Sequence, residues 1–458
     1  MATPAQPARR PNLPSLTGAR WWAAAAVFVL HALVFLAVYP FQKSDLFSTL
    51  HAIVPMQLGS AGVTFFFILS GFLIYWSNSQ LDSVRAGLYY CRRRITKIYP
   101  MHLITMGLFI LAAATVAGYV QAEQAGREPG LLDVAAPFPV SRLICWLPNA
   151  LLIHTFNTDW VMIGGLNVPA WSLASEMLFY LSFPLFVPLL RAIRGRGNWA
   201  GLIGCFLLSL ALITAIHRLA DGSKDTRNFF VPRLWPGEVS PVADVHAHPL
   251  WFIQDSIAVD HTYWLSYYFP PTRLVEFYLG VFAAKLVWEG QFKNTRIAWP
   301  LGLLALSFAA TWFVPVAYKM SVVMSLPMTL VVATLAVRDM SGVSGRISGP
   351  RMVLLGNISF AFYMVQFPVM VFVQRYVLAG KHGGLGLWLA AAAIAFAASF
   401  ILAWILFTFV DEPLMKATAK KTGDTRPHLA DTPHPLVRDT AIMLGRFSPV
   451  TVRPGKNK

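Results

Sequence analysis

Charged residues are scarce in this chain. Asp, Glu, Lys and Arg make up 13% of its 458 residues, whereas ordinary soluble proteins contain about 25%. Hydrophobic residues make up 56%, and the mean hydropathy is +0.55. This composition excludes an ordinary soluble protein. Several apolar stretches approach the ~20 residues that a helix needs to cross a bilayer, so we expect an all-α, polytopic protein embedded in a lipid bilayer.

Cysteine is scarce as well. The chain contains Cys91, Cys145 and Cys205, and none of them has a CxxC or histidine-paired spacing. This excludes a disulfide framework and a cysteine-based zinc site, and no metal is expected. The sequence also contains no internal repeat and no appended soluble domain.

Acidic residues are outnumbered by basic ones, 21 against 37, and the net charge is +16. In a soluble domain this excess could indicate nucleic-acid binding. In a membrane protein it is explained by the Lys and Arg that collect in cytoplasmic loops, so no nucleic-acid partner is expected. The N-terminus resembles a signal peptide, but its apolar run is long and lacks a small-residue cleavage site, which indicates a retained first helix.

Hydropathy divides the chain into three parts. Residues 1–19 are expected to form a disordered basic tail, residues 20–413 a membrane domain with an outer loop at 220–270, and residues 414–458 a mostly disordered basic tail. About ten membrane helices are expected in the domain. They are predicted at 20–39, 59–77, 98–120, 170–190, 199–219, 272–288, 298–316, 321–337, 353–377 and 385–410.

The charges of the connecting loops predict the orientation. Loops 78–97, 191–198, 289–297 and 338–352 each contain at least two Lys or Arg, whereas loops 41–58, 316–320 and 380–384 contain one each. The positive-inside rule therefore places both termini in the cytoplasm.

The first helix carries two groups that could perform chemistry, Arg20 and His31. Eleven residues make three helical turns plus about 20°, with a rise of roughly 16 Å, so the two lie on one face. Arg20 would lie at the cytoplasmic surface, where it suits bidentate phosphate recognition. His31 would lie near mid-bilayer, where an ionisable group usually marks a site and a neutral imidazole can act as a general base. The alternatives are a topological anchor for Arg20 and an interhelical hydrogen bond for His31.

A basic stretch precedes the third helix. Arg92, Arg93, Arg94 and Lys97 are four cations within six residues. They could anchor the topology or form a rim that holds the phosphates of a long nucleotide carrier.

Glu176 is a carboxylate within the apolar fourth helix. Buried Glu is rarely tolerated without a partner, so we expect one such as His31 or Arg273. The pair could belong to a catalytic site, or it could be a structural ion pair.

Other polar groups could support a site. Arg273 and Glu276 lie at i, i+3 on one helix face and could form an internal salt bridge. Ser70 precedes Gly71, a pair that favours close helix packing, and Ser70 as a nucleophile would need a base that no sequence neighbour supplies. Trp171 and Tyr180 are interpreted as interface or core aromatics.

Six stretches in order resemble the acyltransferase-3 family of integral membrane acyltransferases, over residues 20 to about 413. They are R-x10-H, FFFILSGF, RRRITKIYP, WSLASEMLFYL, RLVEFYLG and LGNISFAFYMVQFP. Each is a weak motif alone, but six in the same order are specific. The resemblance implies a ten-helix enzyme that moves an acetyl or other short acyl group from cytoplasmic acyl-CoA to a hydroxyl of a carbohydrate, glycan or glycolipid.

The resemblance also implies which residues act and with what partners. Acyl-CoA, most simply acetyl-CoA, is the donor substrate, no tightly bound cofactor is expected, the location is multi-pass in the plasma (bacterial inner) membrane, and a homo-oligomer stays open. The family's essential Arg and His fall on Arg20 and His31, its basic motif falls on Arg93, Arg94 and Lys97, and its WSL-x-x-E element falls on Trp171, Ser172 and Glu176.

Two positions depart from the family pattern. Lys97 stands where the last cation of the basic motif is commonly Arg, which removes bidentate geometry. Gln366 stands where the ninth-helix motif often has His before an aromatic-Pro pair. Ring chemistry is therefore not required at that position, or the acceptor differs.

The mechanism expected from these residues is acyl transfer from a thioester to a hydroxyl. Arg20 and the basic motif would hold the CoA phosphates, His31 would deprotonate the acceptor, and Glu176 would orient His31. An acyl-enzyme on His31 or Ser70 is the variant, and the sequence leaves both open. The alternative function is a proton-coupled secondary transporter with His31 and Glu176 as a proton relay, although the chain lacks the paired halves that many transporters show.

Overall fold

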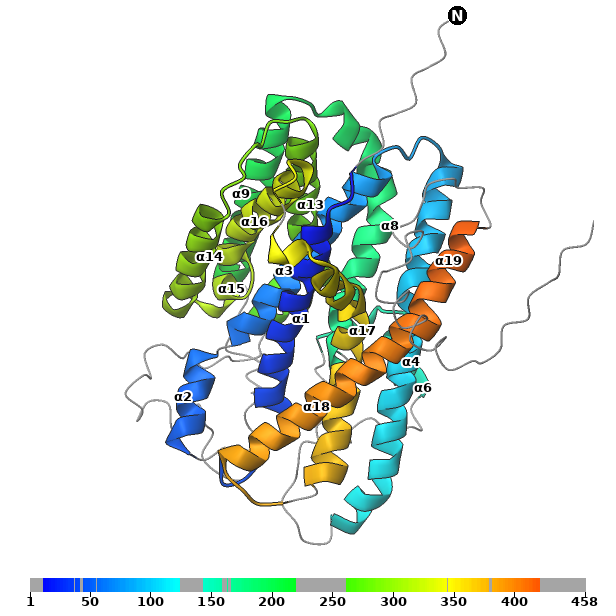
Figure 1. The fold of residues 1–458 in the computed structure, drawn as a ribbon, viewed down its shortest axis with the longest axis vertical. Helices are drawn as coiled ribbons and strands as arrows, with labels where there is room; N and C mark the ends of the chain where they lie inside the picture. The colour runs from blue at the N-terminus through cyan, green and yellow to red at the C-terminus, as the bar shows by residue number, and fades with distance from the viewer. Residues whose placement is uncertain are drawn as a thin grey trace, which may run out of the picture.

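The chain folds into a bundle of helices (Figure 1). The computed structural model describes residues 11–36, 38–41, 44–54, 56–123, 143–158, 163, 166–219, 261–343, 345–378 and 381–420. Among these residues, the backbone pairing of the β type is limited to one isolated bridge between Pro40 and Gly383. The protein is therefore all-α, as its composition predicts.

The longer helices are numbered as in Figure 1. They are α1 (Pro14–Phe35), α2 (Asp45–Ile53), α3 (Met56–Asn78), α4 (Val84–Glu123), α6 (Leu143–Ala150), α8 (Trp171–Ala192), α9 (Arg196–Leu219), α13 (Pro270–Trp288), α14 (Ala298–Ala310), α16 (Val322–Met340), α17 (Pro350–Phe372), α18 (Leu385–Leu406) and α19 (Glu412–Lys420). Shorter helical pieces connect or extend them. They are η2 (His154–Phe156), η3 (Val168–Ala170), α12 (His261–Tyr263), η6 (Trp264–Tyr268), η7 (Thr311–Phe313), α15 (Val316–Lys319), η8 (Arg346–Ser348), η9 (Val373–Leu378) and η10 (Phe407–Asp411).

Each of the ten predicted membrane segments falls on one of these helices. Eight helices in the described part of the chain are long and apolar enough to cross a membrane, which confirms a polytopic membrane fold. The two other predicted segments are α13, which contains Arg273, Glu276 and Lys285, and α14, which has 13 residues. The count of ten crossings and the cytoplasmic location of both termini stay predictions.

The first helix begins earlier than the sequence predicts, so residues 14–19 belong to α1 and not to a disordered tail. Pro14 suits a helix start because its missing N–H is one that the first turn leaves unpaired. The Asp339 carboxylate accepts hydrogen bonds from the Ser15 backbone N–H at 2.8 Å and from its hydroxyl at 2.5 Å. These bonds from the end of α16 satisfy donors at the N-terminus of α1. Residues 1–10 lie outside the described residues.

The basic stretch before the third predicted helix is helical, so the prediction of a loop at 78–97 is wrong over most of its length. The helix α4 begins at Val84 and continues through Pro100. The Ser83 hydroxyl accepts a hydrogen bond from the Ala86 N–H at 3.2 Å and caps the first turn. Hydropathy marks where a helix enters the apolar layer, whereas capping marks where the helix itself begins.

Both predicted polar regions are partly helical. In the outer loop, residues 261–268 form α12 and η6, while residues 220–260 lie outside the described part. In the C-terminal tail, residues 414–420 belong to α19. The helix α6 has eight residues and is too short to span a bilayer.

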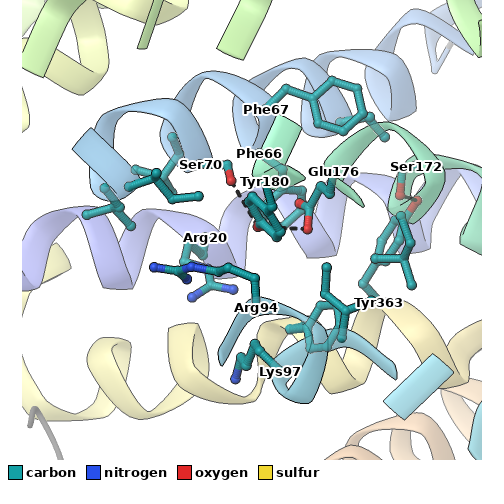
Figure 2. A pocket seen from close by; sticks show the side chains of 17 residues that line it. Arg20, Phe66, Phe67, Ser70, Arg94, Lys97, Ser172, Glu176, Tyr180 and Tyr363 are labelled. Atoms are coloured by element: carbon teal, nitrogen blue, oxygen red, sulfur yellow. Dashed lines mark hydrogen bonds between the residues drawn. The ribbon is translucent and has the colours of Figure 1, made fainter. Parts of the chain in front are cut away.

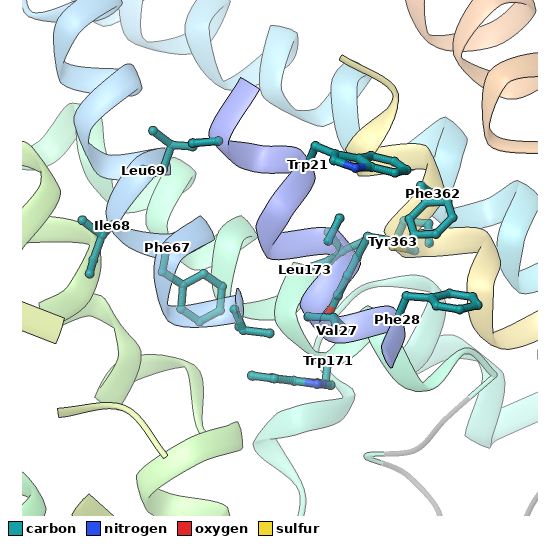
Figure 3. Packing of buried hydrophobic residues seen from close by; sticks show 14 of the residues in the cluster. Trp21, Val27, Phe28, Phe67, Ile68, Leu69, Trp171, Leu173, Phe362 and Tyr363 are labelled. Carbon is teal, nitrogen blue, oxygen red and sulfur yellow. The ribbon is translucent and has the colours of Figure 1, made fainter. Parts of the chain in front are cut away.

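The helix α1 lies at the centre of the bundle and packs against α17 and α3, while α13 packs against α3, α8, α9 and α16. Aromatic side chains fill the α1–α17 contact (Figure 3), where Phe362 lies 5.1 Å from Trp21 and 5.5 Å from Phe28 between ring centroids. Glycine permits the close approach, since a Cβ on Gly356 would lie 1.8 Å from the Thr17 carbonyl oxygen. Small residues and tight packing are how helices associate in lipid. This contact fixes the register of α1 against α17.

Candidate functional site

A cavity of about 130 Å³ lies between α1, α3, α4, α8 and α17. Figure 2 shows cationic side chains at one end of it and hydroxyl groups at the other. It is lined by Arg20, Val63, Phe66, Phe67, Leu69, Ser70, Leu73, Ile74, Arg94, Lys97, Ile98, Ser172, Leu173, Glu176, Tyr180, Phe360 and Tyr363. Residues from the first, second, third, fourth and ninth predicted helices and from the predicted loop 78–97 therefore share one space.

The cationic end is formed by Arg20 from α1 and by Arg94 and Lys97 from α4. Arg94 and Lys97 are three residues apart on a continuous helix and so lie on one face. Aromatic rings support the Arg94 guanidinium, whose central carbon lies 5.4 Å from the Tyr90 ring centroid and 5.5 Å from that of Tyr180. The sequence predicts that Arg20, Arg93, Arg94 and Lys97 lie together, and the structure brings Arg20, Arg94 and Lys97 to one end of the cavity.

Arg93 faces elsewhere. Its guanidinium carbon lies 5.8 Å from the Tyr89 ring centroid, and Arg93 is not among the residues that line this cavity. One residue along a helix is a rotation of about 100°, so two adjacent arginines of one motif are directed apart. The pair provides a natural comparison between a cavity cation and a motif cation outside it.

Among the three cations at this end of the cavity, Lys97 has a carboxylate as its partner. Its ammonium forms an ion pair and hydrogen bond with the Asp411 carboxylate in η10. Asp411 is buried and Lys97 is half-buried. This contact joins the cationic end of the cavity to the C-terminal end of α18.

Glu176 lies in the middle of the cavity within a chain of hydrogen bonds. The Tyr180 hydroxyl donates to the Glu176 carboxylate at 3.0 Å and accepts a hydrogen bond from the Ser70 hydroxyl at 3.0 Å (Figure 2). Glu176 and Tyr180 lie at i, i+4 and so meet on one helix face. Tyr180 is thus a cavity residue and not only a packing aromatic.

The partner predicted for Glu176 is wrong. Arg273 binds Glu276 instead, with its Nη2 atom 2.8 Å from the Glu276 carboxylate. The polar side chain next to His31 is that of Gln366. Tyr180, four residues along the same helix, supplies the hydrogen bond to Glu176. Spacing in the sequence could have suggested this i, i+4 partner.

The end of the cavity opposite the cations is lined by two hydroxyl groups, those of Ser172 and Tyr363. The Ser172 and Tyr363 hydroxyls lie 3.0 Å apart, and Tyr363 also donates to the Pro169 carbonyl at 3.0 Å. Trp171 is not among the lining residues and packs 4.7 Å from Tyr267 and 4.8 Å from Tyr268. Of the WSL-x-x-E element, Ser172 and Glu176 therefore face the cavity and Trp171 supports it from behind.

His31 is not among the described residues that line the cavity. Its ring packs 5.3 Å from Phe35, and its polar neighbour is the Gln366 side chain. Gln366 follows Tyr363 by three residues on α17, a rise of about 5 Å. His31 and the cavity are thus separated by about one helical turn.

Arg273 and Glu276 form a separate buried group on α13. Arg273 also donates to the Thr64 hydroxyl at 3.0 Å and to the Tyr267 carbonyl at 3.3 Å, and it lies 5.1 Å from the Phe67 ring centroid. Its charge and its donors are satisfied within the protein, which is the requirement for a charge buried in a membrane protein. The pair supports the helix that carries Phe67, one of the cavity walls.

Comparison with known proteins places this architecture in a known class. Residues 13–408 of this chain match the family model described as an acyltransferase domain. The chain is 31% identical over 424 residues to the acyltransferase MdmB of Streptomyces mycarofaciens, which covers 91% of this chain and 95% of that relative. No solved structure matches the chain.

The chain belongs to the acyltransferase-3 family, and it is a membrane acyltransferase. An acyltransferase requires an acyl donor and an acceptor. Family membership favours acyl transfer over the alternative of a secondary transporter.

Proposed function

We propose that the protein transfers an acetyl or other short acyl group from cytoplasmic acyl-CoA to a hydroxyl of a carbohydrate, glycan or glycolipid, within the plasma (bacterial inner) membrane. The observation that carries the proposal is the cavity itself. It joins three cations at one end to a carboxylate and hydroxyl groups further in. No tightly bound cofactor is needed for this reaction.

The cationic end suits the phosphates of CoA. Guanidinium groups recognise phosphate with two parallel hydrogen bonds, and an ammonium acts as a point charge. Arg20 and Arg94 supply the first kind of contact and Lys97 the second. In the predicted topology this end faces the cytoplasm, where acyl-CoA is found.

The walls beyond the cations suit the remaining part of the donor. Val63, Phe66, Phe67 and Leu173 are apolar lining residues, and ligand pockets are typically apolar with a few placed polar groups. The pantetheine arm would lie along them and carry the thioester toward Ser172 and Tyr363.

The chemistry divides between two groups in this proposal. His31 removes the proton from the acceptor hydroxyl, whose oxygen forms a bond to the acyl carbon as the carbon–sulfur bond breaks. The sulfur of the donor would lie beside the Glu176–Tyr180 pair, where Glu176 in its protonated form gives its proton to the leaving thiolate. After each turnover the proton on His31 passes to solvent, and Glu176 takes up a proton again. Because one helical turn separates His31 from the cavity, Tyr363 must move aside for the acyl carbon and acceptor to meet.

The test uses purified protein in detergent with labelled acetyl-CoA and a panel of glycans, glycolipids and small hydroxyl compounds. Release of CoA and transfer of label are measured together. Arg94→Ala is expected to raise the KM for acetyl-CoA about tenfold or more, because a charge-assisted phosphate contact is lost. The matched control Arg93→Ala removes the neighbouring cation and is expected to change the KM by less than about twofold.

His31→Ala tests the catalytic assignment. The expected result is loss of label transfer of about a hundredfold or more, the scale of general-base catalysis, with an unchanged elution profile and thermal midpoint. Full activity of His31→Ala, or equal effects of the two arginine variants on the KM, would contradict the proposal.

A further inference from the structure

Gln366 is a fully buried amide beside His31 in the α1–α17 contact. Its Nε2 atom donates a hydrogen bond to the Tyr363 carbonyl at 3.0 Å. Its Oε1 atom and the Nδ1 atom of His31 are both buried and both lack a hydrogen bond. An unpaired buried polar atom costs about 1–3 kcal/mol, so two such atoms on neighbouring side chains are expected to pair with each other.

The bond to the Tyr363 carbonyl sets the orientation of the amide, because turning the amide over would set two carbonyl oxygens against each other. In this orientation Oε1 is the amide atom that is left without a hydrogen bond, and it can only accept one. It is therefore the atom that we pair with the unpaired Nδ1 atom of His31. For Oε1 to accept a hydrogen bond from Nδ1, the ring proton of the neutral imidazole must be on Nδ1.

Packing on both sides holds the two residues in place. Phe35 contacts the His31 ring and lies 4.8 Å from Phe367 between ring centroids. One turn away, Phe28 packs on Phe362. Because these aromatic pairs fix the register of α1 against α17, His31 and Gln366 have little freedom to separate.

We propose that Gln366 is a positioning residue for His31: its Oε1 atom accepts the Nδ1–H of the imidazole and leaves the lone pair on Nε2. This inference rests on the proposed role of His31 as general base. A carbonyl or carboxylate at one ring nitrogen commonly decides which tautomer a catalytic histidine adopts. The lone pair of Nε2 is then free to take a proton from an acceptor hydroxyl.

Charged groups on the surrounding elements lie far from His31. The elements packed against α1 are α17, α3, η8 and α16. Their titratable or charged residues are Arg351 and Tyr363 on α17, Tyr75 on α3, Arg346 in η8, and Arg338 and Asp339 on α16. Tyr363 is bonded to Ser172 and Pro169, and Asp339 is bonded to Ser15 at the opposite end of α1, about 24 Å from His31 along the helix. The Gln366 amide is therefore the group that sets the tautomer.

The direct test is the tautomer itself, read from the ¹⁵N shifts of histidine-labelled full-length protein in detergent at neutral pH. The chain has 11 histidines, so the spectrum of His31→Ala assigns the signal. The expected result is a protonated Nδ1 and an unprotonated Nε2 in the wild type, and a change of this signal in Gln366→Met. A protonated Nε2 in the wild type, or an unchanged signal in Gln366→Met, would overturn the inference.

The kinetic test uses acetyl-CoA turnover and a matched control on the same helix. Gln366→Met is expected to lower kcat about tenfold with an unchanged donor KM, because the base is present but misoriented. Gln366→Glu keeps the acceptor and adds a charge that stabilises the imidazolium, so the acidic limb of the pH–rate profile should move to higher pH. Ser359→Ala removes a buried hydroxyl of α17 that donates to the Gly356 carbonyl in the same helix. It should leave kcat and the pH–rate profile unchanged.

The two tests separate the inference from the proposed function. If the protein shows no CoA-dependent transfer, the ¹⁵N shifts still report whether Gln366 fixes the His31 tautomer. If transfer occurs and Gln366→Met has wild-type kcat, Gln366 has no positioning role.

Discussion

Lys97 in α4 and Asp411 in η10, the segment that follows α18, form an ion pair although they are 314 residues apart in the sequence. The pair makes Lys97 different from Arg20 and Arg94, which line the same cavity. An ammonium bound to a carboxylate has less charge to offer to a phosphate. The pair also fastens the C-terminal end of α18 to the helix that supplies two of the three cavity cations.

The pair predicts opposite effects of its two partners on donor binding. Asp411→Asn should lower the KM for acyl-CoA, because Lys97 is released toward the phosphates. Lys97→Ala should raise the KM, because a cation is lost and an unneutralised carboxylate stays beside the cavity. Each single change should lower stability by about 1–3 kcal/mol, since it leaves a partly buried charge without its partner. Initial-rate kinetics and thermal unfolding in detergent measure both effects.

The double variant Lys97→Ala with Asp411→Asn is the control for this cycle. It removes both charges and should recover most of the stability lost in the single variants. Additive losses in the double variant, or a raised KM in Asp411→Asn, would show that the two charges do not act on each other as described.

The sequence predicts the helices well because length and hydropathy are local properties. Each of the ten apolar ranges falls on a helix, since a membrane span needs about 20 apolar residues in one run. The start of α4 is where this fails. The run around Arg93 has the charge of a loop. A helix can nevertheless continue beyond the apolar layer when its first turn is capped, and the Ser83 hydroxyl caps the first turn of α4.

The cavity is predicted less completely, because hydropathy says nothing about contacts between helices. Arg20, Arg94 and Lys97 could be expected together, as cations at one membrane face. The pairing of Glu176 with His31 or Arg273 is wrong, since it rested on the need for a partner and not on geometry. Asp411 could not be foreseen as the partner of Lys97, because a charge at the end of an apolar helix is usually explained by solvent exposure.

Tyr180 joins Ser70 to Glu176, and this arrangement predicts a catalytic effect of its hydroxyl. Tyr180→Phe keeps the ring against Arg94 and removes both hydrogen bonds. We expect kcat to fall about tenfold or more, since the carboxylate loses its orientation and its route for a proton. The KM for acyl-CoA should change by less than about threefold, because the phosphate contacts are kept.

Tyr90→Phe is the matched control for Tyr180→Phe. Tyr90 also lies against Arg94, at 5.4 Å, but it is not among the lining residues of the cavity. Its hydroxyl should be dispensable for turnover. Equal losses of kcat in the two variants would show that removing either hydroxyl beside Arg94 lowers turnover, so the effect would not be specific to the hydrogen bonds with Glu176 and Ser70.

The crossing of α3 and α13 depends on two glycines that face each other's backbone. A Cβ on Gly71 would lie 1.8 Å from the Phe277 carbonyl oxygen, and one on Gly280 would lie 1.8 Å from that of Ile68. A backbone atom cannot move aside as a flexible side chain can, so the helices must separate. Gly71→Ala should therefore destabilise the protein by about 3 kcal/mol or more, at the upper end of what overpacking costs.

Gly107→Ala is the control for Gly71→Ala, because nothing lies within 4 Å of the position that its Cβ would occupy. It should be neutral or stabilising by up to about 1 kcal/mol, the difference in helix propensity. Thermal midpoints and the monodisperse fraction after purification compare the two variants. If Gly71→Ala has the wild-type midpoint, the α3–α13 contact tolerates a wider spacing. In that case Phe67 and Ser70, which α3 presents to the cavity, are not held in place by this crossing.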